Sequence, residues 1–316
     1  MILTNSELQA WKHCPRCWYL GYYLKLRKVR ETKSTLTVGS LYHRGLEIYY
    51  REGIDPVDYI KARAVSFINE NPDAAADILK DTEMAGIMVE GYMEWLAETG
   101  ADADLEVYAT EAKMRVTVFP SGYDDGIRSW PDGLDLLGKL DARAYLRSSG
   151  ARLFLEHKTC QSLKDLPKTA QTNHQFLTYC LLELLGDVSE HERCDGVLLN
   201  MGRKCKRTAR ANPPFYDRHE VRFNTAELRN HWKHVVGTAD DIQRAIHRLD
   251  SGEDIAYVVP PTTNRDCAWR CGFSSVCQDG MMDDGSDWKG YLREFFEEVD
   301  PLARYDDDED YEEGGE

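Results

Sequence analysis

Residues 137–159 read LGKLDARAYLRSSGARLFLEHKT, and this stretch decides the fold that we expect. Two runs of strand-forming residues, Leu136–Arg147 and Arg152–His157, flank a Ser-Ser-Gly turn signal, which predicts a β-hairpin. Phe154 and Leu155 make the second run apolar on both faces, a pattern typical of a buried strand. We therefore expect this hairpin to form the interior of a sheet.

Three charged residues lie near the open end of the hairpin. Strand side chains alternate between faces, so Glu156 and Lys158 share one face and His157 points to the other. If the turn centres between its two serines, Asp141 falls opposite Glu156 on that same face. The alternative is an ion pair on an exposed sheet face. The apolar second strand argues against an exposed ion pair, because it predicts that the cluster is buried. A buried cluster of charges is costly without a function.

Two carboxylates and an ammonium at one place can hold a divalent metal and orient a water against a phosphodiester. Asp141 and Glu156 would bind Mg²⁺, with the backbone carbonyl of His157 as a third ligand. Lys158 would contact the water and the phosphate. His43, on a helix that begins at Gly39, is a further candidate ligand that would admit Mn²⁺ as well. A lone histidine on a helix is more often structural.

Composition places the chain among ordinary globular proteins. It has 316 residues, 42% hydrophobic and 30% charged, enough for one large domain or two smaller ones. No window of 18 residues is continuously apolar, which predicts no membrane span, and the start lacks the pattern of a signal peptide. Nine cysteines without such a signal favour a reducing, cytoplasmic compartment.

The net charge of −16 argues against bulk electrostatic binding of nucleic acid. Residues 306–316 hold eight of the acids, so the rest of the chain carries −16 + 8 = −8. We expect this acidic tail to be disordered. A local basic groove remains open, and its candidates lie close together in sequence: Arg203, Lys204, Lys206, Arg207 and Arg210.

The order of elements predicts an α/β fold in which helices precede a sheet that one crossover helix interrupts. We expect helices at residues 4–24 (broken at Cys14-Pro15), from residue 39, at 56–99, Thr169–Leu185, 225–250 and 288–298. The expected strands are Leu105–Phe119, the hairpin, Gly196–Met201 and Phe215–Phe223, with polar loops at 27–37 and 120–135. The corresponding division is a helical region 1–104, a core 105–257, a cysteine segment with the last helix 258–300, and the tail 301–316.

Two further groups of residues could carry chemistry. Gln175 and Tyr179 lie four residues apart on an expected helix. They either form its solvent-exposed face or reach a phosphate or a base. Cys267, Cys271 and Cys277 lie within eleven residues, and an early Cys14-x2-Cys17 pair could complete a zinc or iron–sulfur site. The alternative, buried apolar cysteines, fits poorly with a segment that has little core-forming periodicity.

These residues together resemble the RecB-like branch of the PD-(D/E)XK nucleases, and most closely the iron–sulfur exonucleases found beside CRISPR systems and in phages. The matching pieces run in the family's order from Leu8 to Cys277. They are Cys14-Pro15, Gly39-x3-His43, Gly138-Lys139-Leu140-Asp141, Glu156-His157-Lys158, Gln175-x3-Tyr179 and the three late cysteines. Each motif is weak alone, but six in the right order make the match specific.

The resemblance implies a restriction-endonuclease-like core, with a mixed central sheet flanked by helices, and a cluster that clasps the two ends of the chain. Asp141, Glu156 and His43 would bind the metal and Lys158 would be the catalytic lysine. Gln175 and Tyr179 would line the DNA path. Cys14, Cys267, Cys271 and Cys277 would hold a [4Fe–4S] cluster.

The implied substrate is single-stranded DNA degraded from an end, often 5′ to 3′, in recombination, repair or replication within a bacterial or phage-infected cytoplasm. A replication or recombination protein would be a partner. The sequence departs from the family in its Cys-x3-Cys spacing, in the additional Cys17, and in an arginine (Arg143) one residue later than usual. Two other functions stay open, a structure-specific endonuclease and a DNA-binding or partner-docking module without turnover.

Overall fold

The structure of the protein is a computed structural model. It describes residues 1–29, 37–186, 188–189, 192–194, 196–208, 210–268, 271–277, 282 and 285–305. The expected acidic tail, 306–316, lies outside the described residues. The chain divides into two compact units that each combine distant segments: Met1–Arg30 with Thr117–Leu137 and Trp232–Glu316, and Glu31–Val116 with Gly138–His231. We call them the first and the second unit, and the domain boundaries expected from the sequence stay a prediction.

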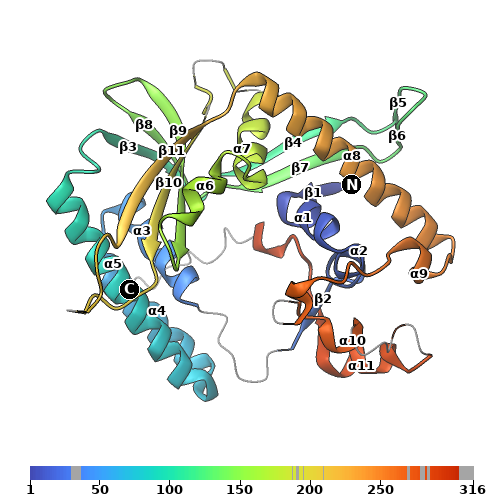
Figure 1. The fold of residues 1–316 in the computed structure, drawn as a ribbon, viewed down its shortest axis with the longest axis horizontal. Helices are drawn as coiled ribbons and strands as arrows, with labels where there is room; N and C mark the ends of the chain where they lie inside the picture. Colours follow the sequence, from blue (N-terminus) through green and yellow to red (C-terminus); the bar gives the residue numbers. More distant parts are fainter. Residues whose placement is uncertain are drawn as a thin grey trace, which may run out of the picture. The chain divides into compact units, whose positions relative to one another are not determined.

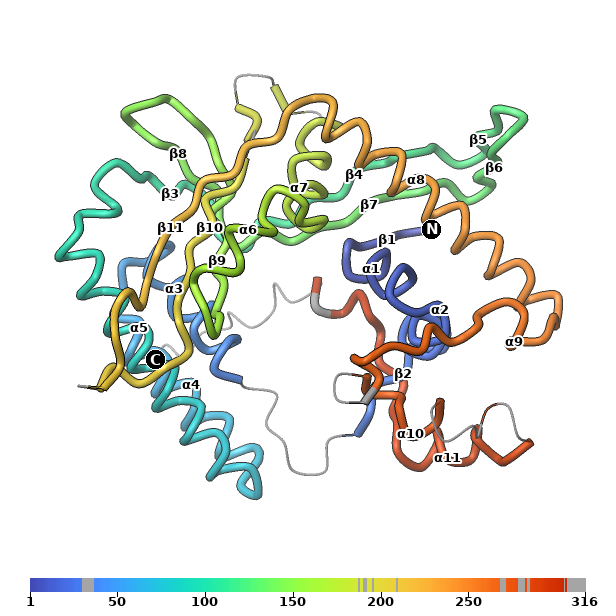
Figure 2. Tube along the Cα trace, viewed as in Figure 1, coloured from blue at the N-terminus to red at the C-terminus, as the bar shows by residue number. Residues whose placement is uncertain are grey.

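The second unit contains a five-stranded mixed sheet in the order β11-β10-β9-β8-β3 (Figures 1 and 2). Its strands are β3 (Leu105–Thr110), β8 (Ala142–Leu146), β9 (Ala151–Cys160), β10 (Gly196–Arg203) and β11 (Tyr216–Arg222). Strands β9 and β10 are parallel, whereas the other neighbours are antiparallel. Strand β10 is buried along nearly its whole length, as a central strand covered on both faces should be.

Helices cover both faces of this sheet. Helix α3 (Val38–Glu52) packs on β3 and β9, and it packs with α4 (Pro56–Glu70) and α5 (Ala75–Thr99). Tyr50 of α3 stacks on His157 of β9, while Tyr179 of α7 (His174–Leu185) meets Phe154 of the same strand. Because strand side chains alternate, α3 and α7 lie on opposite faces of β9 (Figure 1).

Two expected strands are each broken, and the breaks lie side by side. The expected strand Leu105–Phe119 divides into β3 and β4 (Lys113–Phe119), and the first strand of the hairpin divides into β7 (Leu134–Lys139) and β8. Glu111 has a left-handed backbone (φ 50°), which turns the chain out of β3. Strands β4 and β7 join β1 (Ile2–Thr4) in a separate sheet, in the order β1-β7-β4.

The two breaks are held together by backbone hydrogen bonds. The N–H of Glu111 donates to the carbonyl of Asp141 at 2.9 Å, and the N–H of Leu140 donates to the carbonyl of Ala112 at 3.0 Å. Asp141 therefore lies at the point where one sheet ends and the other begins, rather than within a continuous strand.

The expected helix Thr169–Leu185 is also two helices, α6 (Asp165–Ala170) and α7. Asn173 caps α7 by accepting hydrogen bonds from the N–H groups of Gln175 and Phe176, so the chain stops one helix and starts another. The long amphipathic helix expected at 225–250 is α8 (Thr225–Asp250). No helix in the described part of the chain is long and apolar enough to cross a membrane.

Apart from the greater part of α8 and from the sheet strands given above, the first unit is built from short elements. They are α1 (Asn5–His13), α2 (Pro15–Trp18), a π-helical turn (Tyr19–Tyr23), β2 (Leu26–Lys28), β5 (Tyr123–Asp124), β6 (Ser129–Trp130), α9 (Ile255–Val258), a 3-10 turn (Arg265–Ala268), α10 (Ser274–Cys277), α11 (Trp288–Phe295) and β12 (Phe296–Glu298). The last helix thus ends earlier than expected, because Phe296 stacks on Phe273 at 5.2 Å and β12 pairs with β2. Residues 27–28 and parts of 120–135, expected as loop, are paired strands.

Candidate active site

The hairpin of β8 and β9 sets the geometry of the site. Its register pairs Ala142 with Leu155, and the same register places Asp141 at the level of Glu156, as the sequence analysis expected. Glu156 and Lys158 face α7, and His157 faces α3, because their side chains alternate along β9. The strand therefore presents a carboxylate and an ammonium together on one face.

Asp141 crosses from the end of β8 to the backbone of β9. Its Oδ2 accepts a hydrogen bond from the N–H of His157 at 2.8 Å and lies 3.4 Å from Nδ1 of His43. Burial alone would raise the pKa of Asp141, but the neighbouring His43 holds that pKa well below its usual range. Burial lowers and Asp141 raises the pKa of His43, and the net shift is upward. Asp141 is therefore an anion at neutral pH.

Glu156 is buried beside Lys158, whose Nζ donates to Oε1 at 2.5 Å. Its other carboxylate oxygen, Oε2, is buried with no hydrogen-bond partner among the described residues. Burial, and after it the charge of Asp141, raises the pKa of Glu156 to about 7. An orphaned carboxylate oxygen next to a second carboxylate fits a divalent cation, which would supply the missing partner.

A chain of hydrogen bonds holds Lys158 from the side of α7. Its Nζ donates to Oε1 of Gln175 at 3.1 Å, and Nε2 of Gln175 donates to the hydroxyl of Tyr179 at 2.6 Å. That hydroxyl donates to the carbonyl of Lys139 at 2.9 Å. The structure thus brings Gln175 and Tyr179 to the expected lysine, and Tyr179 is buried instead of forming a wet face.

Sequence reasoning missed a second network, which lies behind His157. Nδ2 of Asn200 donates to Nδ1 of His157 at 2.8 Å and to the hydroxyl of Tyr92 at 3.0 Å. Oδ1 of Asn200 accepts from Arg218 at 3.2 Å, and Arg218 also pairs with Asp102 at 2.6 Å. The one available signal was an asparagine inside the apolar run GVLLNMG of β10. Such a residue is expected to carry hydrogen bonds when it is buried.

Two other acids lie near the site. Glu111, at the strand break, pairs with Nζ of Lys139 at 2.9 Å, and burial raises its pKa. Glu47, one turn after His43 on α3, is buried and accepts from Arg44 at 2.6 Å and Arg51 at 2.9 Å. These partners neutralise both acids, so neither offers a free carboxylate to a cation in the structure as it stands.

The expected basic run is partly engaged with acids of α5. Lys206 pairs with Glu83 at 2.6 Å and Arg207 with Glu94, while Arg203 donates to the carbonyl of Asn212 at 2.9 Å. No hydrogen bond from the side chain of Lys204 is described. The role of these residues in binding DNA stays a prediction.

The first unit brings three cysteines into contact. Sγ of Cys17 lies 3.3 Å from Sγ of Cys271, and the thiol of Cys17 also interacts with that of Cys14. This interaction lowers the pKa of Cys14 to about 5 and raises the pKa of Cys17. Burial raises the pKa of Cys277, and the charges of Cys14 and Cys271 contribute to that rise.

Cys267 contacts its own loop. Its Sγ accepts from the N–H of Asn264 at 3.5 Å and lies 3.8 Å from the carbonyl of Thr262. Among the described residues, no three or more His, Cys, Asp or Glu side chains are grouped as a preformed metal site. Binding a metal at the carboxylate site or at the thiol group therefore requires adjustment of side chains.

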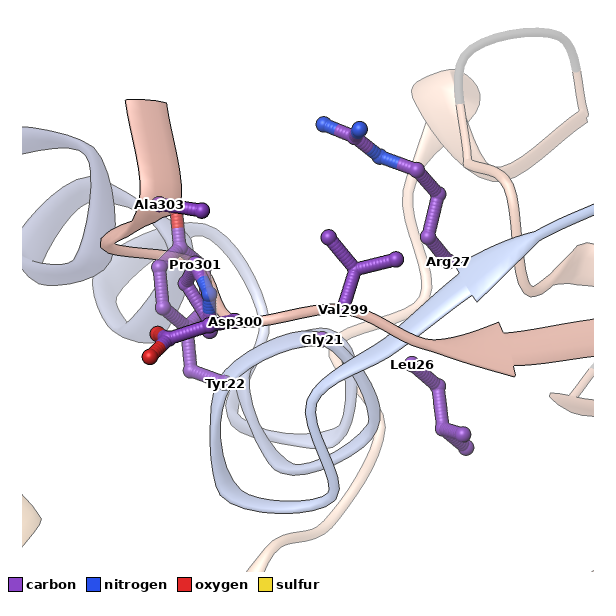
Figure 3. Close-up of a pocket in the computed structure, with 8 residues that line it drawn as sticks. All are labelled: Gly21, Tyr22, Leu26, Arg27, Val299, Asp300, Pro301 and Ala303. Atoms are coloured by element: carbon purple, nitrogen blue, oxygen red, sulfur yellow. The ribbon is translucent and has the colours of Figure 1, made fainter. Parts of the chain in front are cut away.

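A cavity of about 350 Å³ lies in the first unit, between the π-helical turn and the segment that follows β12 (Figure 3). Arg27 and Asp300 are its charged lining residues, and the other lining residues are Gly21, Tyr22, Leu26, Val299, Pro301 and Ala303. None of the candidate site residues lines it. The candidate active site is therefore defined by its side-chain cluster and not by this cavity.

A mixed sheet with an Asp, Glu and Lys group at the end of its central hairpin defines a nuclease of the PD-(D/E)XK class. A comparison with protein-family models matches residues 2–278 to the PD-(D/E)XK nuclease superfamily. The chain belongs to this superfamily. No curated protein gives a significant match. Among solved structures, the chain is similar to a crystal structure from Eubacterium rectale described as a "Putative exonuclease", with 11% identity, coverage of 87% of each chain and a TM-score of 0.44.

Proposed function

We propose that the protein is a metal-dependent DNA exonuclease that prefers single-stranded DNA and degrades it from an end, in the 5′-to-3′ direction. The observation that carries this proposal is the buried Glu156, whose unpartnered Oε2 lies in a cluster with Asp141 and Lys158. Membership of a nuclease superfamily supports the hydrolysis of phosphodiester bonds. The pathway would be recombination, repair or replication, where such DNA ends occur.

Asp141 and Glu156 would hold Mg²⁺ or Mn²⁺, with His43 as an additional ligand. The N–H of His157 points to Asp141, and a strand residue directs its N–H and its C=O to the same side, so the carbonyl of His157 would face the same ion. When bound, a divalent ion supplies Lewis-acid chemistry at a phosphoryl oxygen. The residues fit that ion because they offer two carboxylates, one of them with an unsatisfied oxygen.

Lys158 would act on the scissile phosphate. Its ammonium donates hydrogen bonds to Glu156 and Gln175. Burial lowers the pKa of Lys158, but the charges of Glu156 and Asp141 raise it by more, so the net shift is upward. A fixed positive charge at this place offsets the negative charge that builds up on the phosphate during hydrolysis, and it orients the attacking water. Gln175 and Tyr179 fix the position of Lys158 and form the wall along which the DNA strand would run.

Binding of DNA would use the basic run next to β10. Lys206 and Arg207 would exchange their α5 partners, Glu83 and Glu94, for phosphates. Arg203 and Lys204 would add further phosphate contacts. Each base would lose one ion pair and form another, so the number of ion pairs would change little. The acids of α5 would thus occupy the positions that phosphates take when DNA is bound.

The cysteines of the first unit would hold a [4Fe–4S] cluster. The ligand set implied by the resemblance is Cys14, Cys267, Cys271 and Cys277. The fit is supported by the contact between thiols from the two ends of the chain, near Cys14 and Cys271, because an iron–sulfur cluster needs four thiolates gathered at one place. The cluster would be structural.

The function is tested by digestion of linear single strands labelled at the 5′ or the 3′ end, and of circular single strands, with Mg²⁺ or Mn²⁺. We expect mononucleotides or short products from linear DNA and no cleavage of circles. Cleavage of circles would indicate an endonuclease. Binding without cleavage would indicate a docking module.

Two variants connect that activity to the site. Glu156→Ala and Lys158→Ala should abolish cleavage and leave a folded protein. Lys168→Ala is a matched control, because Lys168 is an exposed lysine with a local ion pair to Asp165. Undiminished cleavage by either site variant would refute the assignment of the site.

A further inference from the structure

Helix α7 covers only part of one face of the five-stranded sheet. Its contacts with that face advance along the helix by four residues, in the pairs Gln175 with Lys158, Tyr179 with Phe154, and Glu183 with Arg143. The helix ends at Leu185, before a further turn could reach Arg152, the next residue of β9 on that face. Helix α7 therefore leaves the part of the sheet around Arg152 uncovered.

Two tyrosines and an arginine form a group on this part of the sheet. Tyr145 of β8 lies directly opposite Arg152 of β9, and Tyr108 lies on the neighbouring strand, β3. The guanidinium carbon of Arg152 is 5.4 Å from the ring centre of Tyr145 and 5.9 Å from that of Tyr108. Both distances are within the range of a cation–π interaction. We call these three residues the aromatic patch.

The ring of Tyr108 is exposed but held in place. Tyr108 is 43% exposed, whereas its hydroxyl lies 3.8 Å from Sγ of Cys194 and interacts with the guanidinium groups of Arg143 and Arg152. The residue also lies at an irregularity in the pairing of β3 with β8, a feature that changes the direction of a side chain. A ring that is fixed before binding loses little freedom when another ring stacks on it, which favours binding.

We propose that the aromatic patch binds the bases of single-stranded DNA by stacking. The inference rests on the proposed function and adds to it a site that holds the strand. Every base has a π face that can stack on a tyrosine ring or on a guanidinium plane, so such a site binds a strand without reading its sequence.

The chemistry of the patch favours a nucleotide over an apolar protein segment. A nucleotide offers both a π face and an anion, which matches a surface where rings and guanidinium groups alternate. Arg147, which follows β8, is exposed and pairs with the exposed Glu106 at 3.4 Å across from Tyr145. An exposed pair of this kind is weak, so Arg147 can turn to a phosphate beside the stacked base.

The aromatic patch and the candidate active site share one face of β9. Arg152 and Glu156 are four residues apart, which is about 13 Å along a strand. The stacked bases would therefore belong to nucleotides near the hydrolysed bond, and the patch would not touch the reacting atoms. A group that holds substrate in this way affects KM and leaves kcat unchanged.

The test measures the binding of two fluorescently labelled single strands to the full chain by anisotropy, in buffer without added divalent ions. One strand is an oligothymidylate, and the other has the same phosphate backbone without bases. Tyr108→Leu and Tyr145→Leu should each weaken binding of the oligothymidylate at least about fivefold. Binding of the strand without bases should not change.

Two matched variants separate stacking from other effects. Tyr108→Phe should bind both strands as the wild type does, because the ring remains. Tyr257→Leu, which changes a tyrosine that is 76% exposed on α9, should also bind as the wild type does. A loss in Tyr108→Phe as severe as that in Tyr108→Leu, or an equal loss for both strands, would overturn the inference, because stacking causes neither.

The outcomes distinguish this inference from the proposed function. Wild-type protein that binds and cleaves single strands, with leucine variants that bind as it does, overturns the inference and leaves the proposed function standing. A preference for bases that the leucine variants lose, in a wild type that cleaves no DNA, supports the patch and refutes the exonuclease. Wild-type protein that binds neither strand overturns both.

Cleavage kinetics give a second measurement. Tyr108→Leu should raise KM for a linear single strand by the factor by which it weakens binding, with kcat unchanged. A fall in kcat at constant KM would overturn the role of Tyr108 in holding the strand.

Discussion

The carboxylate site and the thiol group differ in what holds them. Glu156 and Lys158 lie on β9, a ten-residue strand paired on both sides and packed between helices. Cys17 and Cys277 lie on helices of four residues each, α2 and α10. Helices of this length are not stable by themselves. The sheet fixes the backbone of the first group without any ion, whereas the second group would depend on the proposed metal to stay assembled.

This difference teaches that the same kind of substitution should have opposite consequences in the two regions. Removing a ligand from the sheet should reduce chemistry and leave the fold intact. Removing a ligand from the thiol group should reduce stability and leave the chemistry of each folded molecule intact. The following experiments test that contrast, beginning with the largest expected effect.

Glu156→Gln should reduce cleavage by at least about 10³-fold, because the neutral amide binds a divalent cation poorly. The melting temperature should stay equal or rise, since the change removes a buried charge with an unsatisfied oxygen. Cleavage rates and thermal unfolding measure both effects. Glu220→Gln, at an exposed glutamate on β11, is the control. A large fall in melting temperature would contradict the contrast.

Cys271→Ala should lower the free energy of unfolding by roughly 3–5 kcal/mol, because it would remove a ligand of the proposed metal group, whose binding would stabilise the fold. Cleavage per folded molecule, measured below the melting temperature of the variant, should stay within a few-fold of wild type. Equal stability of the variant and the wild type would show that the thiol group does not hold the first unit together.

Asn200→Ala tests whether the network behind β9 supports the site. The change leaves His157 and Arg218 with unpaired buried groups, which should cost about 2 kcal/mol of stability. Cleavage should fall about tenfold, because residues that orient ligands contribute effects of that size. Denaturant unfolding and the dependence of the rate on Mn²⁺ concentration measure the two effects. Unchanged cleavage would mean that β9 holds its position without Asn200.

The smallest expected effect is the change of stability with pH that arises from one residue of the first unit. Burial raises the pKa of Glu7 to about 7, although the indole N–H of Trp18 donates to it at 3.0 Å and opposes the shift. The folded state then binds more protons than the unfolded state above the ordinary pKa of a glutamate. Stability should therefore fall as the pH rises from about 5 to about 8, by about 2 kcal/mol.

Glu7→Gln should remove this pH dependence, because the amide still accepts from Trp18 and does not titrate. Denaturant unfolding at several pH values measures it. Glu98→Gln, at an exposed position of α5, should keep the wild-type dependence. A wild-type profile in Glu7→Gln would assign the pH dependence to other groups.

Sequence patterns predicted the parts that depend on short-range chemistry. The alternation along β9 and a turn centred between Ser148 and Ser149 were enough to place Asp141 at the level of Glu156. The four-residue spacing of Gln175 and Tyr179 was enough to place them on one face of a helix. In both cases the geometry follows from the period of one element.

The parts that could not be predicted depend on tertiary contacts. The strand breaks occur at Glu111 and Asp141, and neither residue is a glycine or a proline that would mark a break in the sequence. The breaks arise because the two neighbouring segments turn together and share backbone hydrogen bonds. Strands β1, β2 and β12 have three residues each, too few to show a period. The pairing of Cys17 with Cys271 joins segments whose approach no local pattern encodes.

The interruption between β7 and β8 has a consequence for how the site can be observed. Because β8 ends before it reaches His157, the amide of His157 bonds to the carboxylate of Asp141 instead of to a strand partner. Its proton resonance should therefore shift when a cation draws that carboxylate away, and its hydrogen exchange should accelerate at the same ion concentration. One backbone amide of β9 would thus report on the binding of a cation at the proposed metal site.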